Sequence, residues 1–143
     1  MLLAYPVEFQ ADQNGTIIAE LPDLPGTITI GNNERQALER AQGALVAMLA
    51  ARMEDHEPIP APSRPRKGQP VVALLPLIGA KLAIYETMRQ GNITQVELAQ
   101  RLGCDGRQVR RLLDLQHNSR LDQLDAALRV LGKQLVIDVR DAA

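Results

Sequence analysis

The sequence has 143 residues with a net charge of −1, and only 2% of them are aromatic, so any core must be aliphatic. This length fits one ordinary domain or two small ones. The single cysteine, Cys104, excludes an intrachain disulfide and a cysteine-rich metal site. The N-terminus lacks the features of a signal peptide, and the longest apolar run, residues 71–80, is too short to span a bilayer. We therefore expect a soluble, cytoplasmic protein.

The charge is unevenly distributed along the chain. Residues 1–59 contain nine acidic and three basic residues, a net charge of −6, whereas residues 60–143 carry a net charge of +5. An acidic half joined to a basic half indicates two partners of opposite charge. Uneven solvated surfaces are an equally good explanation of such a split when it stands alone.

The N-terminal half reads as a small α+β unit. Apolar and polar residues alternate over residues 3–9, as in a half-buried strand. An Asn14-Gly15 turn follows, since this dipeptide tolerates positive φ angles. The elements expected after it are a returning strand over residues 16–21, a stiff loop over 22–26, a third strand over 27–30, and a helix capped by Asn33 that runs to about Asp55.

Five of the nine prolines lie in residues 58–70, which predicts an exposed loop. Residues 71–75 then resemble a strand that could return to pair with the N-terminal sheet. We expect a domain boundary near Pro76, giving an N-terminal domain over residues 1–76 and a C-terminal domain over residues 77–143. A helix should begin the second domain and end near Gly91.

Residues 94–113 indicate two short helices joined by a tight turn. Thr94 and Glu97 have the spacing of a capping box, and Gly103 falls where the first helix should end in a left-handed conformation. Asp105 can begin the second helix. The spacing of a small residue, a glycine turn and apolar anchors is that of a DNA-binding helix-turn-helix; the small residue and the anchors are Ala99, Val109 and Leu112.

The second of these helices would enter the major groove, where Arg pairs with guanine and Gln with adenine. Gly106 has no side chain at a position expected to contact a base, so more of the base recognition would depend on Arg107. The alternative is a helical module whose arginines are only solvated. The residues expected to contact DNA are Gln95, Arg107, Gln108, Arg110, Arg111 and Asn118.

Two further elements complete the C-terminal half. Ser119, with Asp122 three positions later, should cap a helix that ends at Gly132. Residues 135–139 predict an apolar terminal strand. Because a lone strand in a helical domain would leave its edges unpaired, we expect it to pair with its copy in a second subunit.

No active site emerges from the sequence. His56 and His117 lack a second ligand at metal-binding spacing. The carboxylates Asp12, Glu20 and Asp23 could in principle hold a divalent cation, but an acidic turn-rich edge explains them better. We expect no catalytic residue, no metal and no cofactor.

The order of these elements resembles the HicB antitoxins of bacterial HicA–HicB systems, in the subgroup with a Cro-type helix-turn-helix. The resemblance is carried by the loop Pro22-Asp23-Leu24-Pro25-Gly26 between the second and third strands, and by the helix-turn-helix spacing. Together the matching stretches cover most of the chain.

The resemblance implies an α+β chain: a β-β-β-α-β domain like a partial RNase H fold without its catalytic carboxylates, followed by an all-α helix-turn-helix domain with a C-terminal strand. It implies a type II antitoxin, not an enzyme, that blocks a HicA-like mRNA-cleaving toxin and represses its own operon as a homodimer or higher oligomer. We assign toxin binding to Glu20, Asp23 and Leu24.

Two other functions remain open at this point. The chain could be a stand-alone helix-turn-helix regulator whose N-terminal domain senses a small ligand. It could also be a metal-dependent nuclease built on the N-terminal fold, in which case changing Asp12 or Asp23 would abolish activity.

Overall fold

The computed structural model describes residues 3–142. The chain forms two compact units, and the boundary between them falls between Gly79 and Ala80. Divided there, the sequence carries a net charge of −3 in the first unit and +2 in the second, because the basic residues of the proline-rich segment belong to the first.

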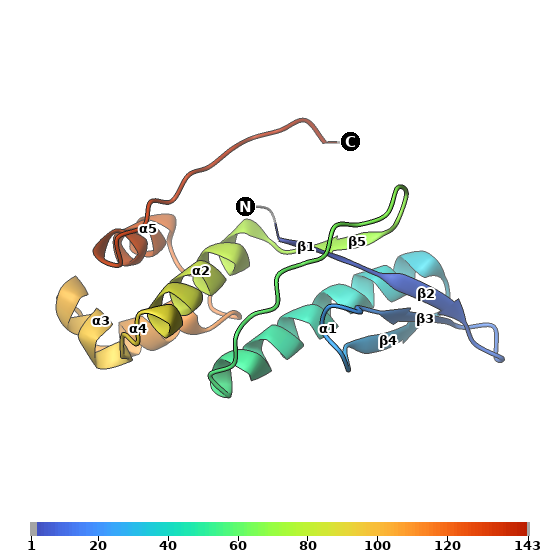
Figure 1. Cartoon of the computed structure of the whole chain (residues 1–143), viewed down its shortest axis with the longest axis horizontal. Helices are drawn as coiled ribbons and strands as arrows, with labels where there is room; N and C mark the ends of the chain where they lie inside the picture. Colours follow the sequence, from blue (N-terminus) through green and yellow to red (C-terminus); the bar gives the residue numbers. More distant parts are fainter. Residues whose placement is uncertain (1–2, 143) are drawn as a thin grey trace. The chain divides into compact units, whose positions relative to one another are not determined.

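The N-terminal unit combines two small antiparallel sheets with one long helix (Figure 1). One sheet pairs β1 with β5, and the other has the strand order β2-β3-β4. The predicted return of the residues after the proline-rich segment to the N-terminal strand is confirmed. The elements are β1 (Ala4–Pro6), β2 (Glu8–Ala11), β3 (Ile17–Glu20), β4 (Ile28–Gly31), α1 (Glu34–Glu54) and β5 (Val71–Ala73).

The single strand predicted over residues 3–9 is divided at Val7, so this prediction was wrong in detail. The Val7 N–H donates to the carbonyl of Pro70 at 2.8 Å instead of joining the β2–β3 ladder. The residues before it pair with β5, with Tyr5 opposite Val72, whereas those after it pair with β3, with Phe9 opposite Ala19. One alternating segment therefore serves two sheets.

Helix α1 packs on β3, β4 and β5. Asn33 caps it as predicted, accepting a 2.8 Å hydrogen bond from the Gln36 N–H. The strand-to-helix connection is tight at Gly31, where an added Cβ would collide with the backbone of Ala37. Glycine is therefore required where β4 approaches the first turn of α1. The face of α1 turned toward the core is formed by Ala37, Ala41, Leu45, Val46, Leu49 and Met53.

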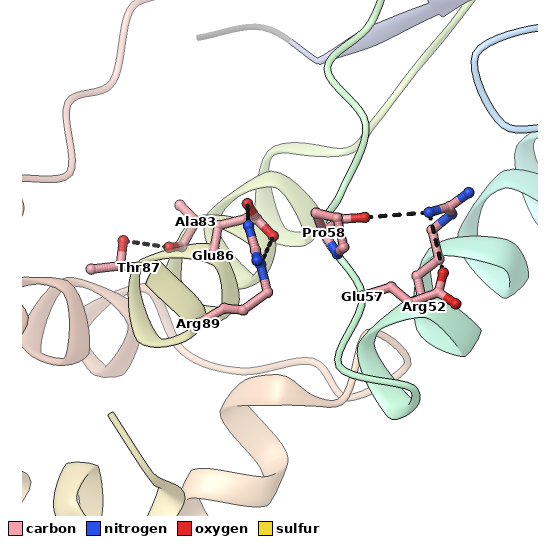
Figure 2. Close-up of polar contacts among 7 residues, drawn as sticks. All are labelled: Arg52, Glu57, Pro58, Ala83, Glu86, Thr87 and Arg89. Carbon is pink, nitrogen blue, oxygen red and sulfur yellow. Dashed lines mark hydrogen bonds and ion pairs between the residues drawn. The ribbon is translucent and has the colours of Figure 1, made fainter. Parts of the chain in front are cut away.

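The proline-rich segment is held against its own unit by several polar contacts. Near its start, Arg52 pairs with Glu57 at 3.2 Å and donates to the carbonyl of Pro58 (Figure 2). The Tyr5 hydroxyl then donates to the carbonyl of Pro60 at 2.7 Å. Ser63 donates to the Asp23 carboxylate from both its N–H and its hydroxyl, at 2.7 and 2.5 Å. A segment with few backbone donors is thus anchored by side chains.

The C-terminal unit is helical. Helix α2 runs across the unit boundary, and α3 packs against α4 and α5 within the unit. Leu98, Val109, Leu112 and Leu124 are buried in this core. The helices are α2 (Pro76–Gln90), α3 (Gln95–Leu102), α4 (Gly106–Leu113) and α5 (Leu121–Val130).

The terminal strand predicted over residues 135–139 is not formed in the single chain. The described residues after Gly132 extend away from α5 without a strand partner (Figure 1). Val136, Ile137 and Val139 are exposed, the last at 88%. The physical reason is that a strand requires a neighbouring strand, and the elements of this unit are helices.

Among the residues that the structure describes, no helix combines the length and the apolar character needed to cross a bilayer.

Candidate functional site

Helices α3 and α4 both begin at a predicted N-cap. The Thr94 hydroxyl accepts a 3.1 Å hydrogen bond from the Glu97 N–H, and the Asp105 carboxylate accepts one of 3.0 Å from the Gln108 N–H. Gly103 ends α3 in the left-handed region, at φ 65°. These bonds satisfy amides at the start of each helix that have no partner within it. The two helices are therefore individually well defined, as a helix-turn-helix requires.

The apolar anchors predicted for this motif lie in the core. Leu98 and Val109 are fully buried, and Ala99 and Leu112 nearly so. A small residue at position 99 permits close approach of α3 and α4. Because Val109 and Leu112 point inward, the polar side chains of α4 are turned to solvent. Burial thus fixes which face of α4 is available to a ligand.

The exposed face of α4 is strongly basic. Arg107, Arg110 and Arg111 are all exposed. No carboxylate of residues 3–142 lies within ion-pair distance of any of these three guanidinium groups. A Cβ at Gly106 would lie 3.5 Å from Nη1 of Arg110, so the first position of α4 faces that side chain. We call Arg107, Arg110 and Arg111 the α4 arginines.

Of the five described arginines elsewhere in the C-terminal unit, four are ion-paired, and the exposed Arg101 of α3 is not. Arg89 donates to the Glu86 carboxylate through two nitrogens, at 3.1 and 3.3 Å (Figure 2). This contact raises the pKa of Arg89. Arg120 and Arg129 pair with Asp122 and Asp125 at 3.1 and 2.9 Å. Three of the four unpaired arginines among the described residues of this unit therefore lie together on α4.

The other residues predicted to contact DNA are also exposed. Gln95 is the first residue of α3, where the helix N-terminus favours an anion. Gln108 lies on α4, and Asn118 lies in the loop between α4 and α5. Gln108, Arg111 and Asn118 line one hollow of about 370 Å³, together with His117 and Arg120.

A buried lysine fixes the C-terminal end of α4, a role that the sequence analysis did not predict. Lys81 of α2 is completely buried, and its ammonium donates to the carbonyls of Arg111 and Asp114, at 2.7 and 2.8 Å, and to the Ser119 hydroxyl at 2.7 Å. A cation is favoured where helix carbonyls have no intrahelical partner. Burial lowers the pKa of Lys81, while the nearby Asp114 raises it.

The use of Ser119 by Lys81 overturns one predicted cap. Helix α5 begins after Arg120, and no side chain caps it. The Ser119 hydroxyl instead accepts from Lys81 and lies 3.3 Å from the carbonyl of Arg111. The predicted cap was therefore wrong, and the role of Ser119 is to complete the buried network.

The residues predicted to bind a protein partner lie in three different environments. Glu20 is exposed at the end of β3. Asp23 accepts both hydrogen bonds from Ser63, so it already has a partner in the proline-rich segment. Leu24 is fully buried. Of the three, Glu20 presents its side chain to solvent, whereas Asp23 and Leu24 hold the loop in place.

Metal or acid–base chemistry has little support. The described residues contain no cluster of three or more His, Cys, Asp or Glu side chains able to hold a metal ion. Asp12 instead accepts hydrogen bonds from the Gln13 N–H and the Thr16 hydroxyl, as turn residues do. Cys104 is half-buried, beside the turn that joins α3 to α4.

Comparison with known proteins gives a consistent result. The family described as HicB-like antitoxin of bacterial toxin–antitoxin systems matches residues 4–83. Antitoxin HicB 2 of Photorhabdus laumondii is 36% identical over 133 residues, covering 93% of this chain and 94% of the relative. Antitoxin HicB of Escherichia coli K12 is 30% identical over 133 residues, covering 93% and 96%. Antitoxin HicB of Pseudomonas fluorescens Pf0-1 is 27% identical over 143 residues, covering 99% and 97%.

Proposed function

Because the chain belongs to the HicB family of antitoxins of bacterial toxin–antitoxin systems, we propose that it blocks a small, basic, HicA-like toxin with its N-terminal unit and represses its own operon with its C-terminal unit. As an antitoxin it is a binding protein and not an enzyme. We place both activities in the bacterial cytoplasm. The N-terminal unit would be a reduced RNase H-like fold, a proposal supported by its meander of strands, long helix and returning strand.

The α4 arginines carry the DNA-binding half of this proposal. They lie on the outward face of a helix whose inward face is anchored by Val109 and Leu112, and they have no carboxylate partner among the described residues. DNA binding then breaks no ion pair within the protein. Gln108 can pair with adenine, while Gln95 and Asn118 are suited to phosphate contacts.

A dimer fits this function. Two recognition helices must lie about 34 Å apart to enter successive turns of the major groove. The exposed apolar segment of residues 135–139 supplies an edge that a second copy can pair with, which supports assembly through the C-terminal units. Further association between such dimers is compatible with this arrangement.

The toxin-binding half follows from family membership and charge. The N-terminal unit has a net charge of −3, which suits a basic partner. Glu20 is exposed for such a contact, and Asp23 and Leu24 keep the adjoining loop in its conformation.

Two experiments test the two halves separately. Co-expression with the small gene next to this one should restore growth and yield a co-purifying complex; a ligand-sensing regulator would do neither. Gel shifts with the upstream promoter at moderate salt should show a specific complex. Arg107→Ala should weaken it by about 1–3 kcal/mol, whereas Arg129→Ala, which removes an arginine already paired with Asp125, should leave it unchanged. Binding that is insensitive to Arg107→Ala would remove the base-reading role.

A further inference from the structure

One face of the β2-β3-β4 sheet is left open. Strand residues alternate between faces, and the register places Glu8 opposite Glu20 and Glu20 opposite Ile28, with Gln10, Ile18 and Ile30 in the next row. The opposite face contains the buried Ala19 and Gly31, on the side of α1. We define the outer sheet face as Glu8, Gln10, Ile18, Glu20, Ile28 and Ile30.

Apolar side chains are exposed across this face. Ile28 and Ile30 of β4 are 54% and 47% exposed, and Ile18 lies directly opposite Ile30 on β3. Such neighbouring β-branched residues form a rigid apolar strip beside polar groups. Exposed strips of this kind mark interaction surfaces more often than isolated apolar residues do.

Two carboxylates on the same face oppose each other. Glu8 and Glu20 form a directly cross-strand pair, an arrangement that destabilises a sheet when both groups are charged. A basic group near them is Arg66, whose Nη1 lies 3.8 Å from Glu8 Oε1 in a largely exposed contact. Because this ion pair is long and exposed, it offsets little of the negative charge of the two glutamates. An added cation placed between the two carboxylates would therefore be attracted by both of them.

We propose that the outer sheet face is the surface that binds the basic toxin, and that a lysine or arginine of the toxin lies between Glu8 and Glu20 with its aliphatic stem over Ile28. This inference rests on the proposed function. A long basic side chain matches the face because it joins an apolar stem to a charged end.

A second copy of this chain is a poorer occupant. Packing one outer sheet face against another would bring four glutamates into one interface, opposed only by the exposed Arg66 of each copy. Bringing like charges together in this way opposes association. Charge complementarity therefore selects a basic partner over self-association.

The test measures toxin affinity and the stability of the free antitoxin in the same full-length variants. In Glu8→Gln/Glu20→Gln, toxin affinity should fall about tenfold or more, while the melting temperature of the free antitoxin stays equal or rises because the repulsion is gone. Ile28→Lys should weaken toxin binding about a hundredfold. Two matched exposed positions serve as controls: Glu39→Gln on α1 and Leu75→Lys before α2, both of which should bind toxin normally.

The outcomes separate this inference from the proposed function. If the wild-type chain does not bind the toxin, the proposed function fails. If it binds and the outer-face variants bind equally well, the function stands and the surface is wrong. Loss of binding in Glu39→Gln would also overturn the surface, since it would place the toxin on α1. A change in the oligomeric state of Ile28→Lys, with toxin affinity unchanged, would assign the face to self-association.

Discussion

The ammonium of Lys81 donates a 2.7 Å hydrogen bond to the main-chain carbonyl of Arg111, so a completely buried cation holds the residue whose own guanidinium faces solvent. The contact joins α2 to the C-terminal end of α4. It sets the position of α4 through the backbone while leaving the arginine side chain free to bind. Lys81 is thus a positioning residue for the proposed DNA interface.

Lys81→Met should uncouple the position of α4 from the rest of its unit. Three acceptors would lose their donor, and we expect the free energy of unfolding to fall by about 1–3 kcal/mol. Operator affinity should fall while toxin affinity does not, because the N-terminal unit is untouched. Chemical denaturation, gel shifts and toxin titration measure the three quantities. Lys133→Met, at an exposed position, is the control. Unchanged operator affinity in folded Lys81→Met would exclude the positioning role.

The same lysine should give the stability an alkaline pH dependence. Burial lowers the pKa of Lys81 below its ordinary value of 10.5. Between the two values the unfolded chain binds more protons than the folded one, so the free energy of unfolding rises with pH in that window. We expect the stability of the wild type relative to Lys81→Met to increase as the pH rises toward 10.5. A difference that is constant over this range would contradict the lowered pKa.

Gly31→Ala and Gly43→Ala should change stability in opposite directions. A Cβ at position 31 would collide with the backbone of Ala37, so β4 and α1 must separate; we expect a loss of about 1–3 kcal/mol. Position 43 lies within α1 with nothing within 4 Å of an added Cβ, and alanine there should add about 0.5–1 kcal/mol. Thermal unfolding of the two variants gives the comparison. An equally stable Gly31→Ala protein would show that the connection can relax.

The salt dependence of DNA binding should depend on the α4 arginines. If Arg110 contacts a phosphate, Arg110→Ala should reduce the slope of log affinity against log salt by about one. Affinity should fall alike for specific and unrelated DNA. Arg129→Ala should leave the slope unchanged, because that arginine is paired with Asp125. Equal slopes in the wild type and in Arg110→Ala would show that Arg110 does not contact a phosphate.

Removing the terminal segment should change the assembly. Truncation after Lys133 deletes the exposed apolar residues of 135–139 and should convert a dimer to a monomer by light scattering, with weaker operator binding. Ile137→Asp should act in the same direction, whereas Asp141→Asn should not. A truncated chain that remains a dimer would move the interface elsewhere.

Local signals in the sequence predicted the caps and turns well. Asn33, Thr94 and Asp105 each accept the backbone hydrogen bond that their spacing indicated, because a cap depends on residues three positions away. Ser119 did not, since its hydroxyl is used by a lysine 38 residues earlier in the sequence. The spacing of a cap cannot reveal such a distant competitor.

Sheet pairing and partner-facing side chains were also harder to predict, because they too depend on residues that are distant in the sequence. The alternation over residues 3–9 is continuous, but Pro70 takes the Val7 N–H and divides the strand. Asp23 and Leu24 lie in the loop of residues 22–26. Ser63 donates to the Asp23 carboxylate, however, and the Leu24 side chain is buried in the core. Glu8 was not selected by the sequence reasoning because its relation to Glu20 arises only when the two strands are in register.

The bare backbone at Gly106 has a consequence for Arg110, whose Nη1 would lie 3.5 Å from an added Cβ. Aspartate at this position would place an anion beside that guanidinium and compete with a phosphate for it. An alanine would only restrict the rotamers that the Arg110 side chain can adopt. The absence of a side chain at Gly106 thus leaves the guanidinium of Arg110, one turn later, free for the proposed contact with DNA.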